Sequence, residues 1–208
     1  RAMVRLDPAT RRHVVALAEL ERASGRGTER ILRVARTIAD LDGASDLAVL
    51  RRSYGAMARH LKEEWEARDT TIPYRSPYEA LIMASIIEKE TGQAGERDMI
   101  GGVLVNRLRI GMRLQVDPTI IYGLGAAFDG NLKRSHLVED SPYNTYTRAG
   151  LPPTPIAMPG LASLRAAVRP GKTDAMYYVS RNDGSSHFSR TLEEHNRAVA
   201  RYQLRGGR

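Results

Sequence analysis

The fold of this chain is organised around one sharply bounded helix, written SPYEALIMASIIEKETG at residues 76–92. Ser76 is a residue type that caps helices, Pro77 suits the first helical position, and Glu79 completes a capping box. The residues that follow are mostly apolar, and a glycine closes the run. The pattern therefore predicts a helix that begins after Ser76 and ends near Thr91, with an apolar stripe along its length.

Helices are also predicted upstream of this segment. Asp7-Pro8 and Thr28 are start signals for two helices, and Ser45 can cap a third helix over residues 46–68. The apolar stripe of that third helix consists of Leu47, Leu50, Tyr54, Met57, Leu61 and Trp65. The first third of the chain is therefore expected to be helical.

Downstream, residues 96–109 show another helical apolar pattern, in which Gly101-Gly102 indicates close contact between helices. Shorter elements follow: a strand at 114–116, a helical turn at 117–122, a long loop at 142–159, a helix at 161–168, a β-hairpin formed by 175–180 and 187–190 around Asn182-Asp183-Gly184, and a helix from Thr191. The predicted fold class is α+β and predominantly helical. We expect an N-terminal helical segment at residues 1–75 and a second domain at residues 76–208.

Composition limits the possible functions without choosing one. The 208 residues are 42% hydrophobic, which is enough for a genuine core, and the formal net charge of +8 predicts attraction to polyanions. There are no cysteines, so disulfides and thiolate metal sites are excluded. The longest apolar stretch, residues 80–87, is far shorter than the roughly 20 residues that a membrane span needs.

Several familiar kinds of site are disfavoured by the spacing of their residues. AAVRPGKT at residues 166–173 loosely matches a phosphate-binding loop, but it follows a predicted helix and precedes a strand, the reverse of the required order. The five histidines do not fall at metal-ligand spacing, and no serine lies in a nucleophile elbow. Among the familiar kinds of catalytic site, acid/base chemistry by a carboxylate is the one that the sequence still allows.

Glu90 is the candidate for that chemistry. It follows Met83, Ile86 and Ile87 by seven, four and three residues, so its side chain projects along the apolar stripe of its helix. Apolar surroundings and the helix C-terminus both disfavour the ionised form, which predicts a raised pKa. Glu88 shares this reasoning. Solvated charges at the end of a helix are the alternative interpretation of both residues.

The chain resembles the endolytic murein transglycosylases, the MltG or YceG-like family. The matching pieces are ASIIEKET at 84–91, Glu96-Arg97, VNRL at 105–108, GMRLQVDPTIIYG at 111–123, SPYNTY at 141–146, GLPP at 150–153, Pro155-Ile156 and Pro159-Gly160. With looser similarity at His187-Phe188 and residues 191–196, the resemblance covers roughly residues 76–204. Residues 1–44 match nothing in the family pattern.

The resemblance implies a lysozyme-like catalytic core that cleaves the β-1,4 bond between N-acetylmuramic acid and N-acetylglucosamine within glycan strands, leaving 1,6-anhydro ends. The second glutamate of the Glu-Lys-Glu-Thr motif is the family's catalytic acid/base, which corresponds to Glu90. Expected substrate-binding residues are Gln115, Asp117, Tyr122, Asn144, Thr145, Tyr146 and His187, with Glu88 and Asn106 in supporting positions. A single carboxyl group suffices, because the sugar's own 6-hydroxyl replaces water as the nucleophile.

The same resemblance implies where the protein acts and what it meets. The expected substrate is the peptidoglycan strand, and the expected protein partners are cell-wall synthesis enzymes, with no nucleic acid, no cofactor and no metal. The expected location is the extracytoplasmic face of the bacterial cytoplasmic membrane, with an anchoring transmembrane helix upstream of this sequence. Termination or release of nascent strands would be the cellular role.

Two other functions stay open from the sequence. A relative that binds peptidoglycan without cleaving it would keep the groove and lose the chemistry. A basic nucleic-acid-binding protein is suggested by charge alone, since lysines and arginines are scattered over several helices and no groove-reading motif occurs.

Overall fold

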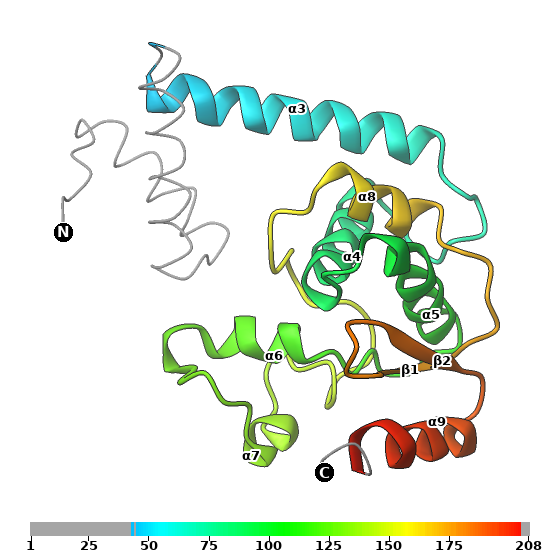
Figure 1. The fold of residues 1–208 in the computed structure, drawn as a ribbon. Coiled ribbons are helices and arrows are strands. Elements are labelled where there is room, and N and C mark those ends of the chain that lie inside the picture. The colour runs from blue at the N-terminus through cyan, green and yellow to red at the C-terminus, as the bar shows by residue number, and fades with distance from the viewer. Residues whose placement is uncertain (1–42, 44, 205–208) are drawn as a thin grey trace. The chain divides into compact units, whose positions relative to one another are not determined.

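The structure is a computed structural model that describes residue 43 and residues 45–204 (Figure 1). The chain divides into two compact units, one of residues 1–60 with 124–129 and one of residues 61–123 with 130–208. The helices predicted after Asp7-Pro8 and from Thr28 lie outside the described residues. The candidate active site lies entirely in the second unit.

The described elements are predominantly helical. They are α3 (Asp46–Glu66), α4 (Pro77–Glu90), α5 (Arg97–Arg109), α6 (Asp117–Leu124), α7 (Arg134–Val138), α8 (Leu161–Val168), β1 (Tyr177–Ser180), β2 (Ser186–Ser189) and α9 (Leu192–Val199), with short 3-10 turns at Ala94–Glu96 and Gly125–Ala127 and a π-helical turn at Ala200–Leu204. The two strands form a small antiparallel sheet. The predicted α+β, mainly helical class is confirmed.

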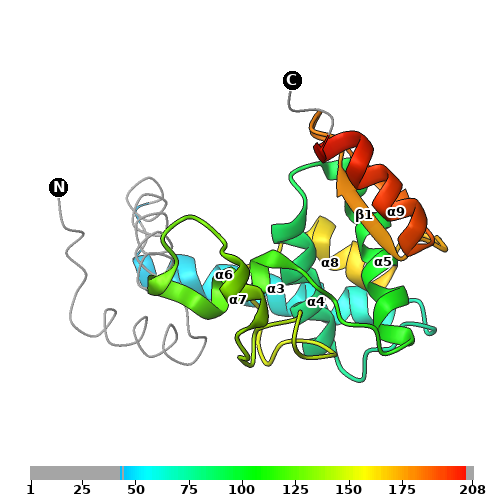
Figure 2. The same cartoon turned by 90° about the horizontal axis from the view of Figure 1, so that it is seen from below.

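Helix α4 forms the centre of the second unit. Ser76 caps it by accepting a hydrogen bond from the Glu79 backbone N–H at 3.3 Å, as its sequence predicts. Its buried residues are Ala80, Ile82, Met83, Ala84, Ser85, Ile86 and Ile87. Helices α5 and α8 pack against it, and the three lie together in two perpendicular views (Figures 1 and 2).

The predicted close helix contact at Gly101-Gly102 is confirmed. A Cβ atom on Gly101 would lie 2.6 Å from the backbone oxygen of Ala166 in α8, closer than real Cβ atoms approach another atom. Gly102 is equally restricted by the backbone oxygen of Gly171. Glycine at these two positions is therefore what lets α5 approach α8 and the segment that follows it.

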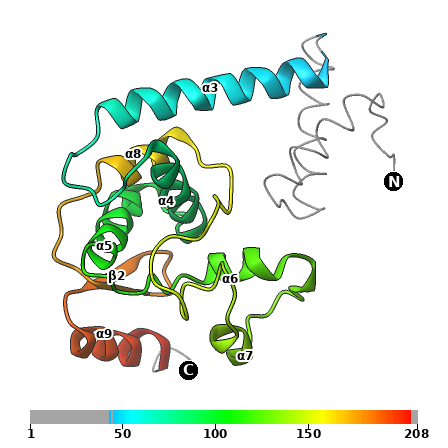
Figure 3. The ribbon, with the colours of Figure 1, turned by 180° about the vertical axis from the view of Figure 1, so that it is seen from behind.

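The C-terminal part also forms as predicted. Asn182 and Gly184 adopt positive φ angles of 64° and 87°, which residues in a tight hairpin turn require. Thr191 then caps α9, with the reciprocal bond of Glu194 completing a capping box. Helix α9 contacts both strands of the hairpin and runs along it in Figure 3.

Two expectations about local structure were wrong, and one short helix was not predicted. Residues 114–116 form no strand, because Gln115 has a φ of +52° that interrupts an extended backbone. Tyr54, placed on the apolar stripe of α3, is 77% exposed. Helix α7 lies within a stretch for which no helix was predicted, because its five residues are too few to show a period.

Two further features bear on domain organisation. The second compact unit starts at residue 61 rather than at 76, and its core includes Ile72 and Tyr74. Compactness does not show which residues the catalytic domain needs, so its predicted start at residue 76 stays a prediction. Among the described residues, none of the helices combines the length and the hydropathy required to cross a bilayer.

Candidate active site

Glu90 is the last residue of α4 and carries an unusual carboxyl group. Its Oε2 atom is fully buried and has no hydrogen-bond partner. Burial raises the pKa of Glu90 to about 7, because the ionised form loses its hydration. At neutral pH the side chain is therefore divided between its acid and base forms, which suits a group that must first donate and then accept a proton.

Three side chains from distant segments adjust this pKa. A hydrogen-bond interaction with the hydroxyl of Tyr178 in β1 lowers the pKa of Glu90, the negative charge of Asp117 raises it, and the positive charge of Arg107 lowers it. These contributions are smaller than that of burial. The carboxyl group thus sits among groups that respond to its charge, contributed by α5, α6 and β1.

Arg107 is buried at 6% exposure and is fixed by backbone oxygens on two sides. Its Nε donates to the Met176 carbonyl at 2.7 Å, and its Nη1 donates to the Leu114 carbonyl at 2.5 Å. Met176 immediately precedes β1, which carries Tyr178, and Leu114 lies three residues before Asp117. One guanidinium group therefore holds together the two segments that deliver the neighbours of Glu90.

Asp117 and Tyr146 form a second polar pair in this site. The Tyr146 hydroxyl donates to Asp117 Oδ1 at 2.6 Å. Burial raises the pKa of Tyr146, and the hydrogen bond to Asp117 and the charges of Asp117 and Glu90 raise it further, so the phenol stays protonated. Asp117 is exposed at the first turn of α6 and faces solvent with one carboxylate oxygen held.

Glu88 has the opposite character to Glu90, although only one residue separates them. Its Oε2 accepts hydrogen bonds from the Gly160 N–H at 3.0 Å and the Ser163 hydroxyl at 2.6 Å. Burial works to raise the pKa of Glu88, but these two hydrogen bonds outweigh it and lower the pKa. Glu88 is therefore an ionised anchor at the start of α8, where a negative charge also suits the helix dipole.

Asn144 and Thr145 are buried, in contrast to the expectation that they contact substrate. Asn144 is 1% exposed and its Nδ2 donates to the carbonyls of His136 at 3.0 Å and Glu139 at 2.6 Å, while its Oδ1 accepts from the Tyr146 N–H. The Thr145 hydroxyl accepts from the Val116 N–H at 3.0 Å. Both side chains are occupied by the protein itself, because they hold the long loop on α7 and α6.

Gln115 and Tyr122, two further residues expected to bind substrate, lie close to Asp117 in the chain. Gln115 is exposed beside Asp117, in a strained positive-φ conformation fixed by the bond from its N–H to the Thr145 carbonyl. The ring of Tyr122 packs against Tyr143 with centroids 5.0 Å apart. Gln115 lies two residues before Asp117, and Tyr122 lies on α6, the helix that begins at Asp117.

His187 and Asn106 form their contacts with groups other than the Glu90 carboxyl. In the hairpin register, Tyr178 is paired with Phe188 and Val179 with His187, so His187 projects from the face opposite Tyr178. The ring of His187 lies 5.7 Å from that of Tyr202. Asn106 donates to the Thr173 carbonyl at 2.9 Å and supports the chain that leads to β1.

Comparison with known proteins assigns the chain to a family. The model of the YceG-like family matches residues 39–201, most of the 208 residues. The chain belongs to the YceG-like family. A second family model, that of the C-terminal part of magnesium chelatase subunit ChlI, matches residues 1–51, largely upstream of the YceG-like region.

Relatives of this YceG-like chain include curated proteins named endolytic murein transglycosylase. One from Bacillus subtilis (strain 168) is 44% identical over 127 residues, which cover 61% of this chain and 35% of that protein. One from Streptococcus pneumoniae serotype 2 is 33% identical over 136 residues, covering 60% of this chain and 23% of that protein. The chain therefore spans about a third or less of the length of these relatives.

A solved structure is also similar. The crystal structure of a YceG-like protein from Listeria monocytogenes matches with a TM-score of 0.63 and 38% sequence identity, covering 73% of this chain and 48% of that one. The described fold of this YceG-like chain thus agrees with that of an experimentally determined relative.

Two site residues of the YceG-like chain escaped the sequence analysis. Arg107 lies in the VNRL stretch at 105–108 that carried the resemblance, yet nothing in its spacing indicates a buried cation beside Glu90. Tyr178 lies in a predicted strand, where alternation identifies its face but not what covers it. Among the residues that the structure describes, no group of three or more His, Cys, Asp or Glu side chains could hold a metal ion.

Proposed function

We propose that this chain is the catalytic part of a peptidoglycan lytic transglycosylase that cleaves the β-1,4 bond between N-acetylmuramic acid and N-acetylglucosamine. The observation that carries the proposal is the buried carboxyl of Glu90, whose pKa of about 7 suits one group that acts in turn as acid and base. The names of the curated relatives support the reaction class. The proposed cleavage is endolytic, within a strand.

In the first step, the protonated Glu90 carboxyl donates its proton to the glycosidic oxygen as the bond from that oxygen to C1 of the muramic acid breaks. Glu90 then becomes a carboxylate in a site from which water is largely excluded. The Arg107 charge and the Tyr178 hydroxyl stabilise that carboxylate, as their effects on the pKa of Glu90 indicate.

In the second step, the Glu90 carboxylate accepts the proton of the sugar's 6-hydroxyl while that oxygen bonds to C1. The product is a 1,6-anhydro ring, and Glu90 regains its proton, so no water is consumed and no second carboxylate nucleophile is needed. Asp117, oriented by Tyr146, would stabilise the positive charge that develops on the sugar ring.

We further propose that Gln115, Asp117, Tyr122 and Tyr146 line the glycan groove, while Asn144 and Thr145 hold the loop that carries Tyr146. Glu88 and Asn106 have supporting roles through α8 and through the segment before β1. His187 has no place in this groove, because it projects from the other face of the hairpin.

The cellular setting is part of the same proposal. The substrate is the peptidoglycan strand, and action on it takes place outside the cytoplasm. Anchoring to the membrane by an upstream helix, contact with cell-wall synthesis enzymes and termination of nascent strands would follow from the family resemblance. We also propose that residues 76–208 hold the catalytic residues and that residues 1–75 serve another purpose.

The decisive experiment compares wild type with Glu90→Gln on purified sacculi, with mass spectrometry of the released fragments. The Gln variant keeps the shape of the side chain but has no proton to donate, so release of anhydro-ended fragments should fall by at least about 100-fold. Glu88→Gln is the matched control on the same helix and should retain most activity, because Glu88 contacts α8 rather than the Glu90 site.

Each other outcome has a definite meaning. Undiminished cleavage by Glu90→Gln would refute the assignment of the acid/base. Fragments that are one water heavier than the anhydro product would indicate a hydrolase. Binding of sacculi by wild type without any cleavage would instead identify a peptidoglycan-binding relative that lacks activity.

A further inference from the structure

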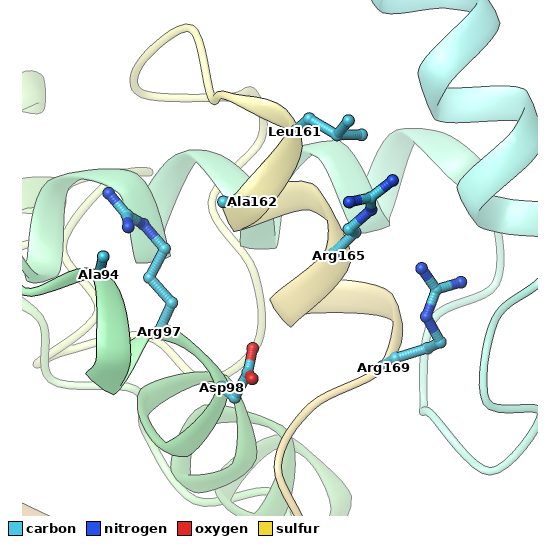
Figure 4. Close-up of a pocket in the computed structure, with 7 residues that line it drawn as sticks. All are labelled: Ala94, Arg97, Asp98, Leu161, Ala162, Arg165 and Arg169. Atoms are coloured by element: carbon cyan, nitrogen blue, oxygen red, sulfur yellow. The ribbon is translucent and has the colours of Figure 1, made fainter.

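A cavity in the same compact unit has a lining that does not include Glu90. Its volume is about 590 Å³, which is within the range of small-ligand pockets. Its lining residues are Ala94, Arg97, Asp98, Leu161, Ala162, Arg165 and Arg169 (Figure 4). They come from the 3-10 turn at Ala94–Glu96, the start of α5, α8 and the residue that follows α8. None of the side chains that adjust the pKa of Glu90 is among them.

Two of its three arginines form ion pairs with one buried carboxylate. Glu64 has 9% of its side chain exposed and forms ion pairs with Arg165, at 2.8 Å to Nε, and with Nη2 of Arg169. The side chains of Arg165 and Arg169 remain 57% and 40% exposed. One negative charge therefore orients two guanidinium groups while neutralising only half of their charge, and part of each remains accessible.

The third arginine, Arg97, has an unmet hydrogen bond. Its Nε is buried and has no acceptor, and it forms no ion pair with any residue that the structure describes. Its charge is close enough to lower the pKa of Glu88, although it is a smaller influence than the hydrogen bonds that Glu88 makes. A buried guanidinium N–H without an acceptor is costly. A ligand in the cavity would meet the terminal nitrogens of Arg97, which are not among its fully buried, unpaired atoms.

Guanidinium groups dominate the polar lining of the cavity. Arg97, Arg165 and Arg169 contribute three positive charges, and the nearby carboxylates of Asp98, Glu64 and Glu88 balance them. A ligand would therefore be bound by the N–H groups of the arginines rather than by a net charge. Guanidinium groups bind planar carboxylates through two parallel N–H bonds. The cavity therefore has the composition of a receptor for an organic carboxylate.

We propose that this cavity binds a carboxylate of the peptide that peptidoglycan strands carry, so that the protein prefers strands with acidic peptides. This inference rests on the proposed function, because it takes the strand as the substrate. Glu88 supports the connection: it binds the start of α8, which lines the cavity, and stands two residues before Glu90 on the same helix. The last turn of α4 therefore carries both the acid/base and a residue that binds a helix lining the cavity.

The test uses two substrates that differ only in charge: glycan strands bearing native peptides, and the same strands after their peptide carboxyls are converted to amides. Wild type should cleave the native strands about 10-fold faster, the effect of one or two charge-assisted hydrogen bonds. Arg97→Gln should cleave both strands at equal rates. Arg97 is the residue to change because it has no ion pair with a described residue, whereas changing Arg165 or Arg169 would leave Glu64 buried with an unpaired charge.

Lys172→Gln is the matched control, since it removes one exposed positive charge outside the cavity and should leave the preference intact. A wild-type protein that treats both strands alike, or an Arg97→Gln variant that keeps the full preference, would overturn the proposal. Under either of these outcomes, the proposed reaction would still stand if wild type cleaved amidated strands and Glu90→Gln did not.

A binding measurement keeps the inference independent of catalysis. Glu90→Gln protein, which should not cleave, is titrated with fluorescently labelled strands of both kinds. Native strands should bind to this protein about 10-fold more tightly than amidated strands. The double variant that carries both Glu90→Gln and Arg97→Gln should bind the two kinds of strand equally. Equal affinity of the Glu90→Gln protein for both strands would contradict the carboxylate site even if no cleavage were ever observed.

Discussion

At the scale of single residues, Glu88 and Glu90 show how position on one helix decides ionisation. Both occupy the last turn of α4, yet one has a lowered pKa and the other a pKa raised to about 7. Glu88 gains two hydrogen bonds to its ionised form, whereas Glu90 has a buried oxygen that gains none. Hydrogen bonding to the charged form, rather than burial alone, separates their roles.

The pKa of Glu90 predicts how the rate depends on pH. Because the first step needs the protonated acid, kcat/KM should be level below about pH 7 and fall about tenfold for each further pH unit. Assays of anhydro-end release on purified strands between pH 5 and pH 9 measure this. A rate that still rises between pH 7 and pH 9 would mean that Glu90 does not act as the acid.

Arg107 is predicted to be a positioning residue that acts through Glu90. Arg107→Gln removes the positive charge, so the pKa of Glu90 should rise and the alkaline fall in rate should move to higher pH, with a rate loss of about 10- to 100-fold at pH 7. Arg107→Lys keeps the charge and should leave the pH at which the rate falls closer to that of wild type. A purely structural role is indicated instead if both variants lose rate with unchanged pH profiles.

Ionisation of Glu90 should also lower the free energy of unfolding at high pH. The pKa of Glu90 in the folded protein, about 7, exceeds its ordinary value of 4.5, so the folded state binds the extra proton and stability falls as pH rises between these values. Glu90→Gln avoids ionisation and should raise the free energy of unfolding by about 3 kcal/mol at pH 8, with little change near pH 4. Denaturant unfolding at both pH values tests this, and an equal effect at both would contradict the shifted pKa.

At the scale of elements, the packing of α4, α5 and α8 depends on contacts that have no room for additional atoms. Gly101→Ala would place a methyl group 2.6 Å from the Ala166 oxygen and 3.4 Å from Ile87 Cδ1. The helices must then separate, so the free energy of unfolding should fall by about 1 to 3 kcal/mol or more.

The control for Gly101→Ala is Gly55→Ala, within α3. A Cβ there meets only Arg59 Nη1 at 3.7 Å, and alanine favours helices, so stability should stay the same or rise by up to about 1 kcal/mol. Thermal unfolding of the two variants provides the comparison. Similar losses in both would mean that the α5–α8 contact is less restrictive than its geometry indicates.

At the scale of the whole molecule, the second compact unit should fold as residues 61–208. A fragment that starts at residue 76 lacks the buried Ile72 and Tyr74 and the Glu64 carboxylate that binds α8, so it should be less stable than the 61–208 fragment by at least about 3 kcal/mol. Equilibrium unfolding of the two fragments measures the difference. Equal stability would support the domain boundary at residues 75–76.

The sequence by itself determined the features that depend on neighbouring residues. The caps at Ser76 and Thr191, the hairpin turn at 182–184 and the helical fold class follow from bonds made within a few positions along the chain. Helix periodicity made Glu90 a candidate acid for the same reason, because it places the side chain beside apolar residues. It made Glu88 a candidate as well, and the family resemblance chose between the two.

Only the tertiary structure decided what surrounds those residues. Arg107 and Tyr178 reach Glu90 from α5 and β1, and Asn144, expected to contact substrate, is buried under backbone carbonyls of the loop around α7. Loss of hydration and the effect of nearby charges depend on atoms that are close in space but 17 to 88 positions away in the chain, counted from Glu90 to Arg107 and to Tyr178. The pattern of residues along a helix can therefore identify a candidate acid, but only the packed structure supplies the groups that set its pKa.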